Sequence, residues 1–457
     1  MSKNCRRTAR LLLSLLLSAL YCGSVHAAAE YALQSGVSWY RIDNPFLFPN
    51  GSSDKLNSVA NAWSDDLRGA LFLPLPTERS TLQLTAAVSQ MHYNGLFGNY
   101  TDELSNGGPY SLSKPIKQMQ AVYQWEFDEL LRGRLSHRTD DRLYGYFGGE
   151  VVPSSSAVPP NLSNIEPEFP HLREDSVEVA YIVNHHLDVP LTWTQQTMSY
   201  MNPGRVEIFN MRSNALQAAM RYTAGTNSSM TVGIRRTAID FPDRSAADIS
   251  LYDSGYTDTE LFSDTAWRYT DNTLIKVHLG AISRQFNTLS NSNSKLLSTE
   301  LGAEWRLSDK TTLSGSFWDR PQASDQADNW LYVISRGAQA RAVWQATPKS
   351  TLSLLGSLEL QKSQSFPRAD SSTVLTNGSN KIQRLDVRCD HEITRRLSVR
   401  VEAALVQTIA NSGSPVTYRG NQIQISLRYT FDNLSGPFTS DNPQGDNHAR
   451  QQIEALQ

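Results

Sequence analysis

The chain has 457 residues, of which 42 are basic and 45 acidic, and its formal net charge is −3. Four of the basic residues lie in an N-terminal segment that, as argued below, resembles a secretory signal. Without them the chain has 38 basic against 45 acidic groups and a charge of −7, which argues against nucleic acid as a partner. Two of the three cysteines, Cys5 and Cys22, lie in the same N-terminal segment. If that segment is removed on export, Cys389 is left without a partner for an internal disulfide.

The N-terminus has the form of a secretory signal. Four basic residues between positions 3 and 10 precede the apolar run LLLSLLLSALYC, and Val25-His26-Ala27 supplies the small-residue pattern of a cleavage site. We therefore expect a signal peptide over 1–27 and Sec-type export. No later segment reaches the 18 or so consecutive apolar residues that a membrane helix requires.

Several later stretches alternate strictly between apolar and polar residues. They are QMQAVYQWEF (118–127), STELGAEWRL (298–307), TLSLLGSLEL (351–360), LSVRVEAAL (397–405) and QIQISLRYTF (422–431). A period of two indicates a strand with two unlike faces. Such stretches run about 9 to 12 residues, which suits a tilted strand that crosses a bilayer, and they exceed the usual strand of a soluble protein.

The connections between these stretches alternate in length. Counting strands from Tyr31 gives roughly 18, with 16 to 18 as the expected range. Brief turns are expected at 76–80, 184–186, 224–228, 270–272, 307–310, 346–349 and 394–396. Longer links are expected at about 43–58, 93–115, 139–175, 200–212, 240–256, 286–296, 319–329, 362–381 and 407–420. The pattern predicts an all-β, up-and-down antiparallel transmembrane barrel over 28–431, with short periplasmic turns and long extracellular loops.

An internal repeat supports hairpins. The segments that begin at Trp267, Trp305 and Trp344 recur every 38 or 39 residues, each with an aromatic residue before a short turn. Aromatic side chains favour the membrane-water boundary. We therefore predict an aromatic girdle at the turn rim, formed by Trp125, Trp267, Trp305, Trp344, Tyr429 and Phe431. A soluble propeller with a period near 40 is the competing interpretation.

Together with these hairpins, three further stretches carry a family resemblance: Arg41-Ile42-Asp43-Asn44-Pro45-Phe46, Asp240-Phe241-Pro242-Asp243-Arg244 and the closing Tyr429-Thr430-Phe431. The chain resembles the EpsL-type outer-membrane β-barrels associated with exopolysaccharide biosynthesis, a branch of the putative β-barrel porin group. The resemblance implies a role in building or exporting a secreted polysaccharide. Such barrels usually end on the last aromatic residue, whereas 26 residues, 432–457, follow Phe431 here. We expect these to form a polar, flexible periplasmic tail.

If the apolar face meets lipid, the other face lines the lumen. The charged residues predicted to lie there are Arg221, Lys276, Glu300, Glu304, Arg306, Arg341, Glu359, Arg388, Arg400, Glu402 and Arg428. Two interpretations remain open. Neighbouring strands pair these charges into ladders that stiffen the wall, or the groups exchange hydrogen bonds with solutes that pass through a hydrophilic path.

One loop is a candidate constriction. The segment 147–175 contains Pro153, Pro159, Pro160, Pro167 and Pro170, so we expect an extended segment without regular structure, folded into the lumen or facing outward.

The sequence holds no recognised catalytic or metal-binding motif, and no cofactor is expected. His185 and His186 lie in a predicted short turn without further ligands nearby. A barrel hydrolase that uses His137, Asp140 or Asp141 is a minor alternative.

The sequence therefore predicts a porin-like protein of a Gram-negative outer membrane, acting as a passive pore or assembly component for exopolysaccharide. Alternatives are a general diffusion porin for small hydrophilic solutes, a barrel hydrolase and a structural anchor. The expected partners are outer-membrane lipid, the barrel-assembly machinery, and polysaccharide with its export components.

Overall fold

The computed structural model describes residues 29–43, 60–75, 79–93, 115–127, 129–141, 170–200, 206, 209–225, 228–323, 330–365, 379–412 and 418–433. The strands are β1 (Glu30–Asp43), β2 (Ala60–Pro74), β3 (Ser80–Tyr93), β4 (Ile116–Phe127), β5 (Leu131–Asp141), β6 (His171–Asn184), β7 (Leu187–Ser199), β8 (Met211–Thr223), β9 (Ser229–Asp240), β10 (Gly255–Thr270), β11 (Thr273–Phe286), β12 (Ser294–Ser308), β13 (Thr311–Ala323), β14 (Trp330–Thr347), β15 (Ser350–Ser365), β16 (Ser379–Glu392), β17 (Leu397–Ser412) and β18 (Tyr418–Asp432). The short helices α5 (Ala246–Tyr252) and η3 (Ser290–Ser292) lie between strands.

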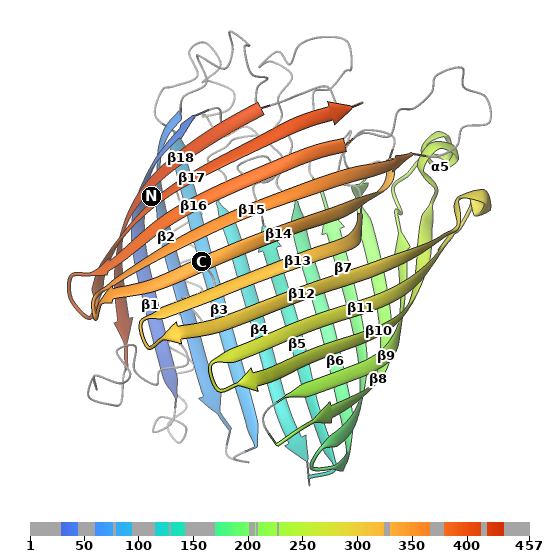
Figure 1. Cartoon of the computed structure of the whole chain (residues 1–457), viewed down its shortest axis with the longest axis horizontal. Coiled ribbons are helices and arrows are strands. Elements are labelled where there is room, and N and C mark those ends of the chain that lie inside the picture. Colours follow the sequence, from blue (N-terminus) through green and yellow to red (C-terminus); the bar gives the residue numbers. More distant parts are fainter. Residues whose placement is uncertain are drawn as a thin grey trace.

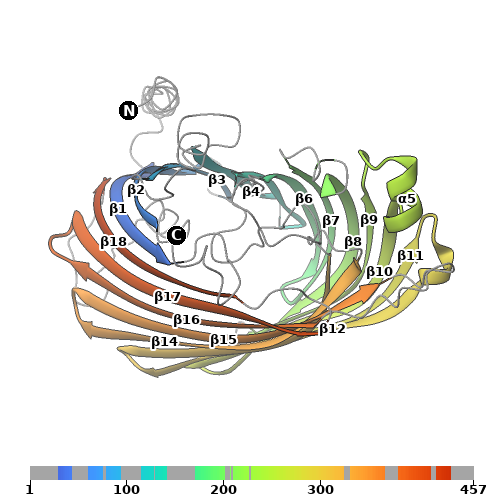
Figure 2. The same ribbon diagram turned by 90° about the horizontal axis from the view of Figure 1, so that it is seen from above.

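The strands form one 18-stranded antiparallel sheet that closes on itself. Each strand pairs with its neighbours in the chain, and β1 also pairs with β18, where Trp39 lies opposite Ile425. Seen from the side the strands are tilted, and seen from above they form an oval ring (Figures 1 and 2). The predicted fold class is confirmed, with 18 strands. A propeller is excluded because the sheet is a single closed ring.

The two faces of the wall follow the alternation in the sequence. On β18, Ile423, Ile425 and Leu427 are large exposed apolar side chains, whereas Ser426 and Arg428 on the other face are buried. The register places Val37 of β1 opposite Leu427, and Val37 is also exposed. An apolar outer face and a polar inner face characterise a barrel whose solvent outside is lipid.

The repeated hairpins share one turn device. Thr270, Ser308 and Thr347 each lie three residues after the tryptophan of their repeat, and each hydroxyl accepts a hydrogen bond from the backbone N–H two residues later. The strand register shifts at the same three places. A hydroxyl that bonds the backbone locally favours a tight turn. The sequence repeat therefore encodes the turns as well as the aromatic residues.

The short turns lie at one end of the barrel, called the short-turn rim below. The rim at the other end carries α5, visible at its edge in Figure 1. Ser245 caps the helix, and its hydroxyl accepts from the backbone N–H of Asp248. Arg244 stacks on the Phe241 ring, 3.6 Å from its centroid, and donates to the carbonyl of Asp253. The Asp240–Arg244 stretch singled out in the sequence therefore begins an ordered connection between β9 and β10.

Several strands extend further toward this rim than the sequence predicted. β6 begins at His171 and β13 continues to Ala323, so the expected loops over 139–175 and 319–329 were too long at those ends. Likewise β17 ends at Ser412 and β18 begins at Tyr418. The extensions are rich in polar residues. They can still pair as strands, because backbone pairing does not require apolar side chains.

The first and last strands, which pair with each other, lie at the two ends of the expected barrel domain in the sequence. β18 ends at Asp432, one residue beyond the predicted limit, and the Asn433 side chain accepts from the backbone N–H of Tyr31 and donates to the carbonyl of Ala29. The predicted signal peptide, the tail from 434 onward and the proline-rich segment through 169 lie outside the described residues. Among the described helices, none is long and apolar enough to cross a membrane.

Candidate functional site: the inner wall of the barrel

The structure places all eleven charged residues predicted to line the lumen on the inner face. The register puts them on the face of the sheet that does not carry the exposed apolar side chains. One row of this inner face joins Lys276, Gly302, Ser316 and Gln339 across β11 to β14. The eleven residues come from eight strands, β8, β11, β12 and β14 to β18. Their side chains do not all have the same surroundings, and the difference divides the wall into distinct zones.

One zone is a set of cross-strand ion pairs on β5 to β8. Arg221 donates to Asp188, at 2.9 Å from Nε to Oδ1, and to Glu178, at 3.1 Å from Nη2 to Oε1. Arg132 donates to the second oxygen of the Asp188 carboxylate. Asp188 is buried, and a buried carboxylate requires such partners. Arg221 therefore serves the wall, as the ladder interpretation expects.

Further pairs continue this pattern around the barrel. Arg388 and Arg400 both donate to the Asp390 carboxylate, each at 2.6 Å. Glu300 accepts from Arg320 at 3.1 Å, and Glu359 accepts from the Ser335 hydroxyl at 2.7 Å.

The inner wall next to the closure between β1 and β18 is polar and closely packed. The Ser38 hydroxyl donates to Ser426 at 2.8 Å, and the Gln34 amide donates to Thr430 at 3.0 Å. These four side chains are buried, as is Arg428. This part of the inner face is therefore closed to solvent.

By contrast, the side chains of five of the predicted lumen residues form no hydrogen bond or ion pair with any residue that the structure describes. They are Lys276, Glu304, Arg306, Arg341 and Glu402. Three of these, Lys276, Glu304 and Arg341, line one cavity.

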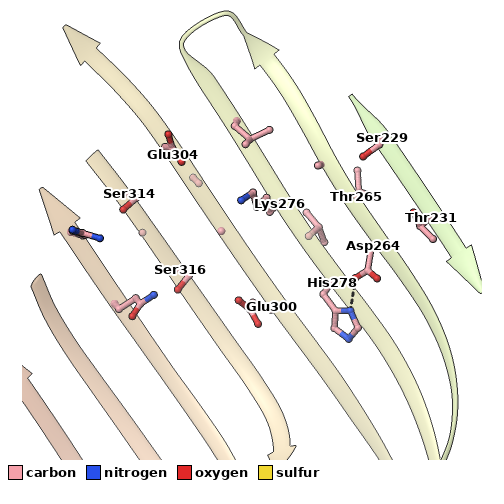
Figure 3. Close-up of a pocket in the computed structure, with 18 of the residues that line it drawn as sticks. Ser229, Thr231, Asp264, Thr265, Lys276, His278, Glu300, Glu304, Ser314 and Ser316 are labelled. Carbon is pink, nitrogen blue, oxygen red and sulfur yellow. Dashed lines mark hydrogen bonds and ion pairs between the residues drawn. The ribbon is translucent and has the colours of Figure 1, made fainter. Parts of the chain in front are cut away.

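This cavity has a volume of about 750 Å³ and lies against strands β9 to β15. Figure 3 shows Lys276 between the Glu304 and Glu300 carboxylates, with Ser314 and Ser316 on the adjacent strand. At one end, His278 Nδ1 lies 2.6 Å from Asp264. The lining combines charges of both signs with hydroxyl and amide groups, so it offers donors and acceptors to a hydrophilic molecule.

A second cavity of about 460 Å³ lies near the short-turn rim. Basic residues outnumber acidic ones in its lining by seven to three, and the basic ones include Arg388, Arg396, Arg400, Lys310 and Lys349. Sequence reasoning placed Arg388 and Arg400 on the lumen face but missed the two lysines and Arg396, which belong to the turns. Their gathering could be foreseen only from the closure that brings successive turns onto one rim.

All six residues of the predicted girdle lie on the outer face near the short turns. Five are prominently exposed, and Trp125 is half-buried against Gly133 of the next strand. Four more exposed aromatic residues, Phe127, Tyr181, Tyr222 and Tyr269, stand at the ends of strands beside short turns and were missed. The signal was present in the sequence, because each precedes a short turn by one to four residues. Their role at a membrane boundary remains a prediction.

The residues considered for catalysis are not brought together. Asp140 is buried and accepts from Gln118 and Arg138, whereas His137 and Asp141 belong to the outer-facing set and pair with Asp175 and His171. His186 lies 2.8 Å from the carbonyl of Thr223. No group of three or more potential metal ligands occurs among the described residues.

Comparisons with known proteins concern the fold. No family model matches the chain, and no curated protein matches it. Among solved structures it is similar to OccK9 (OpdG) of Pseudomonas aeruginosa, with 10% identity over 90% of this chain and 100% of that chain and a TM-score of 0.48. It is also similar to OccK1 (OpdK) of the same organism, with 9% identity over 88% and 98% and a TM-score of 0.47. A third is OccAB3 of Acinetobacter baumannii, with 9% identity over 89% and 100% and a TM-score of 0.45.

The closed ring, the even strand number, the apolar exterior and the charged interior decide the class of protein on their own. The chain is a transmembrane β-barrel of the outer-membrane type.

Proposed function

We propose that the protein is a passive channel for small hydrophilic solutes. The observation that carries this proposal is the charged and polar inner face of a closed 18-stranded barrel. Barrels of 16 to 18 strands are wide enough to hold an aqueous channel, whereas barrels of eight strands are filled by side chains. Charges such as Lys276 and Glu304, which have no partner among the residues that the structure describes, keep their hydration on such a wall, which an apolar or fully paired interior would not allow.

The charges on the wall have both signs, so the channel should discriminate only weakly between small cations and small anions. The mixed cavity and the basic cavity lie along the same wall, toward β9–β15 and toward the turn rim respectively. A solute that crosses would meet both zones. Small polar molecules, rather than strongly charged ions of one sign, are therefore the proposed cargo.

The proposal is tested by single-channel conductance of the refolded protein in a planar bilayer, with and without residues 151–169, a deletion that ends before β6 begins at His171. We expect steady nanosiemens-scale conductance from at least one of the two forms. A rise on deletion would identify the proline-rich segment as a constriction. Liposome swelling with neutral sugars of increasing size would then give the exclusion limit. Absence of conductance and swelling from both forms would contradict the channel.

The exopolysaccharide role stays a prediction from the family resemblance. No described residue favours a polymer over a smaller solute, whereas the cavity of about 750 Å³ has the size of a small-molecule site. The proposed partners are the lipid of the outer membrane and the machinery that inserts barrels into it.

A further inference from the structure

Three charged side chains that pair with no described residue surround one recess in the inner wall. Glu304 of β12 and Arg341 of β14 lie on the same rung, separated by Ser314 of β13. Two strand spacings set their backbones about 9.6 Å apart. Lys276 of β11 is the diagonal neighbour of Glu304, since it lies opposite Gly302. The side chains come from three different strands and all line the same cavity.

The floor of this recess is made of small residues. Gly302 lies between Lys276 and Ser316 on one rung, and Ser314 lies between Glu304 and Arg341 on the next. A Cβ atom built on Gly302 would find no atom closer than 3.8 Å. The absence of side-chain bulk at this point leaves space in the cavity that Lys276, Glu304 and Arg341 line, and Figure 3 shows the first two of these beside Ser314 and Ser316.

The other charged residues of the recess already have partners and do not neutralise these three. His278 lies between Asp264, at 2.6 Å from Nδ1, and Glu260, at 3.4 Å from Nε2. Glu260 also accepts from Arg235, and Glu300 accepts from Arg320. Lys276, Arg341 and Glu304 are therefore the charges available to a molecule in the recess.

We propose that this recess is a binding subsite for zwitterionic solutes of the size of an amino acid or a dipeptide. The proposal deepens the channel function and rests on it for physiological meaning. The solute carboxylate lies between Lys276 and Arg341, and its ammonium group faces Glu304. The Ser314 and Ser316 hydroxyls and the Gln339 amide bond the polar groups between the two ends.

The charges favour a zwitterion over an ion of one sign. A simple anion would be attracted by Lys276 and Arg341 but repelled by Glu304, and a simple cation would meet the reverse. A molecule with both charges uses all three side chains and brings no net charge into the recess.

The test compares three matched probes on the detergent-solubilised full chain: glycylglycine, its N-acetyl derivative, which is only anionic, and its C-terminal amide, which is only cationic. Saturation-transfer NMR titrations give the dissociation constants. We expect glycylglycine to bind about tenfold more tightly than either derivative, because one charge-assisted hydrogen bond is lost in each. Equal binding of the acetylated derivative would overturn the zwitterion assignment.

Substitutions assign the two charges to their ends. Glu304→Gln should abolish the preference for glycylglycine over the acetylated probe, and a Lys276→Gln, Arg341→Gln double variant should abolish the preference over the amide. A Glu304→Gln variant that keeps the wild-type preference would overturn the proposal. Gly302→Trp should fill the recess and weaken glycylglycine binding at least tenfold. Ser176→Trp, on the inner face of β6 outside the recess, is the matched control and should keep the wild-type preference.

Conductance separates this proposal from the channel itself. Binding with the expected preference but without conductance would overturn the proposed function and leave the subsite standing. Conductance with no preference among the three probes would leave the channel standing and overturn the subsite.

Discussion

Two glycines leave room for an aromatic ring on the neighbouring strand. Gly133 of β5 lies opposite Trp125 of β4, and Gly337 of β14 lies opposite Trp318 of β13. A Cβ atom on either glycine would overlap the indole ring of its partner. Trp318 is further fixed by donating its indole N–H to the Ser335 hydroxyl at 2.8 Å. Each glycine therefore supplies the space that an aromatic ring on the next strand occupies.

We predict that Gly133→Ala and Gly337→Ala each lower the free energy of unfolding by about 1 to 3 kcal/mol, the usual cost of overpacking. Equilibrium unfolding in urea from lipid vesicles gives the measurement. Gly356→Ala on β15 is the control, because a Cβ atom there meets nothing within 4 Å. If all three alanine variants were equally stable, the rings would have moved aside without cost.

The pairing of individual charges is where sequence reasoning stops. Alternation was enough to place Arg221 and Lys276 on the inner face, since a period of two fixes the side of the sheet. It could not distinguish them further. Arg221 reaches Asp188 and Glu178, which are 33 and 43 residues away in the chain, whereas Lys276 has Gly302 opposite. The partner of a charge depends on cross-strand register, which the sequence leaves open.

At the scale of elements, Asp253 ties two loops together beyond the strands. Its carboxylate accepts hydrogen bonds from the backbone N–H groups of Ser254, Gly255, Thr288 and Leu289, at 2.6 to 3.2 Å. Only 1% of its surface is exposed. Its φ of 68° and ψ of 161° fall in a region that glycine alone usually adopts. The hydrogen bonds therefore hold a strained backbone that joins α5 to β10 and to the β11–β12 loop.

We predict that Asp253→Asn opens this junction while the barrel stays folded. An amide NH₂ group would face N–H donors in place of a carboxylate oxygen, and losing a bond to a charged group costs about 2 kcal/mol. Hydrogen exchange at the backbone N–H groups of residues 288 and 289 should then be roughly 30-fold faster. Asp271→Asn, at an exposed position in a short turn, should leave exchange unchanged. Unaltered exchange in the Asp253 variant would show that the loops are held by other contacts.

The strands themselves were largely predictable, and their ends were not. The sequence indicated the existence and faces of strands such as β12, β15 and β18 because their apolar residues recur every second position over a full membrane crossing. β13 shows the limit, because it runs through Pro321 to Ala323 where the sequence suggested a loop. Above the apolar band nothing in the side chains marks where backbone pairing stops, and the neighbouring strand decides it.

The whole molecule has two chemically different rims on its outer face. The short-turn rim carries a dense row of exposed aromatic side chains, including Trp267, Trp305 and Trp344. Near the other rim, outer-facing positions are often charged, as with Arg336, which pairs with Asp319 at 2.5 Å, and Arg173, which pairs with Asp175 at 2.9 Å. Aromatic residues suit a lipid interface, and charged pairs suit the polar headgroup region. The orientation itself follows from the connections, because short turns join the strands at one rim and longer segments at the other, which favours the turns in the periplasm.

That orientation predicts which rim an external reagent reaches. In a Cys389→Ser background, Asn291→Cys lies in the β11–β12 connection at the long-loop rim, and Asp309→Cys lies in the short turn after β12; both positions are exposed. A bulky, membrane-impermeant maleimide on intact cells should label Asn291→Cys and spare Asp309→Cys, and both should react after the outer membrane is permeabilised. The two positions belong to opposite ends of the same strand, so they report on one element. Labelling of Asp309→Cys alone in intact cells would require the inverted barrel, with the aromatic rim facing outward and the basic cavity of the turns at the cell surface.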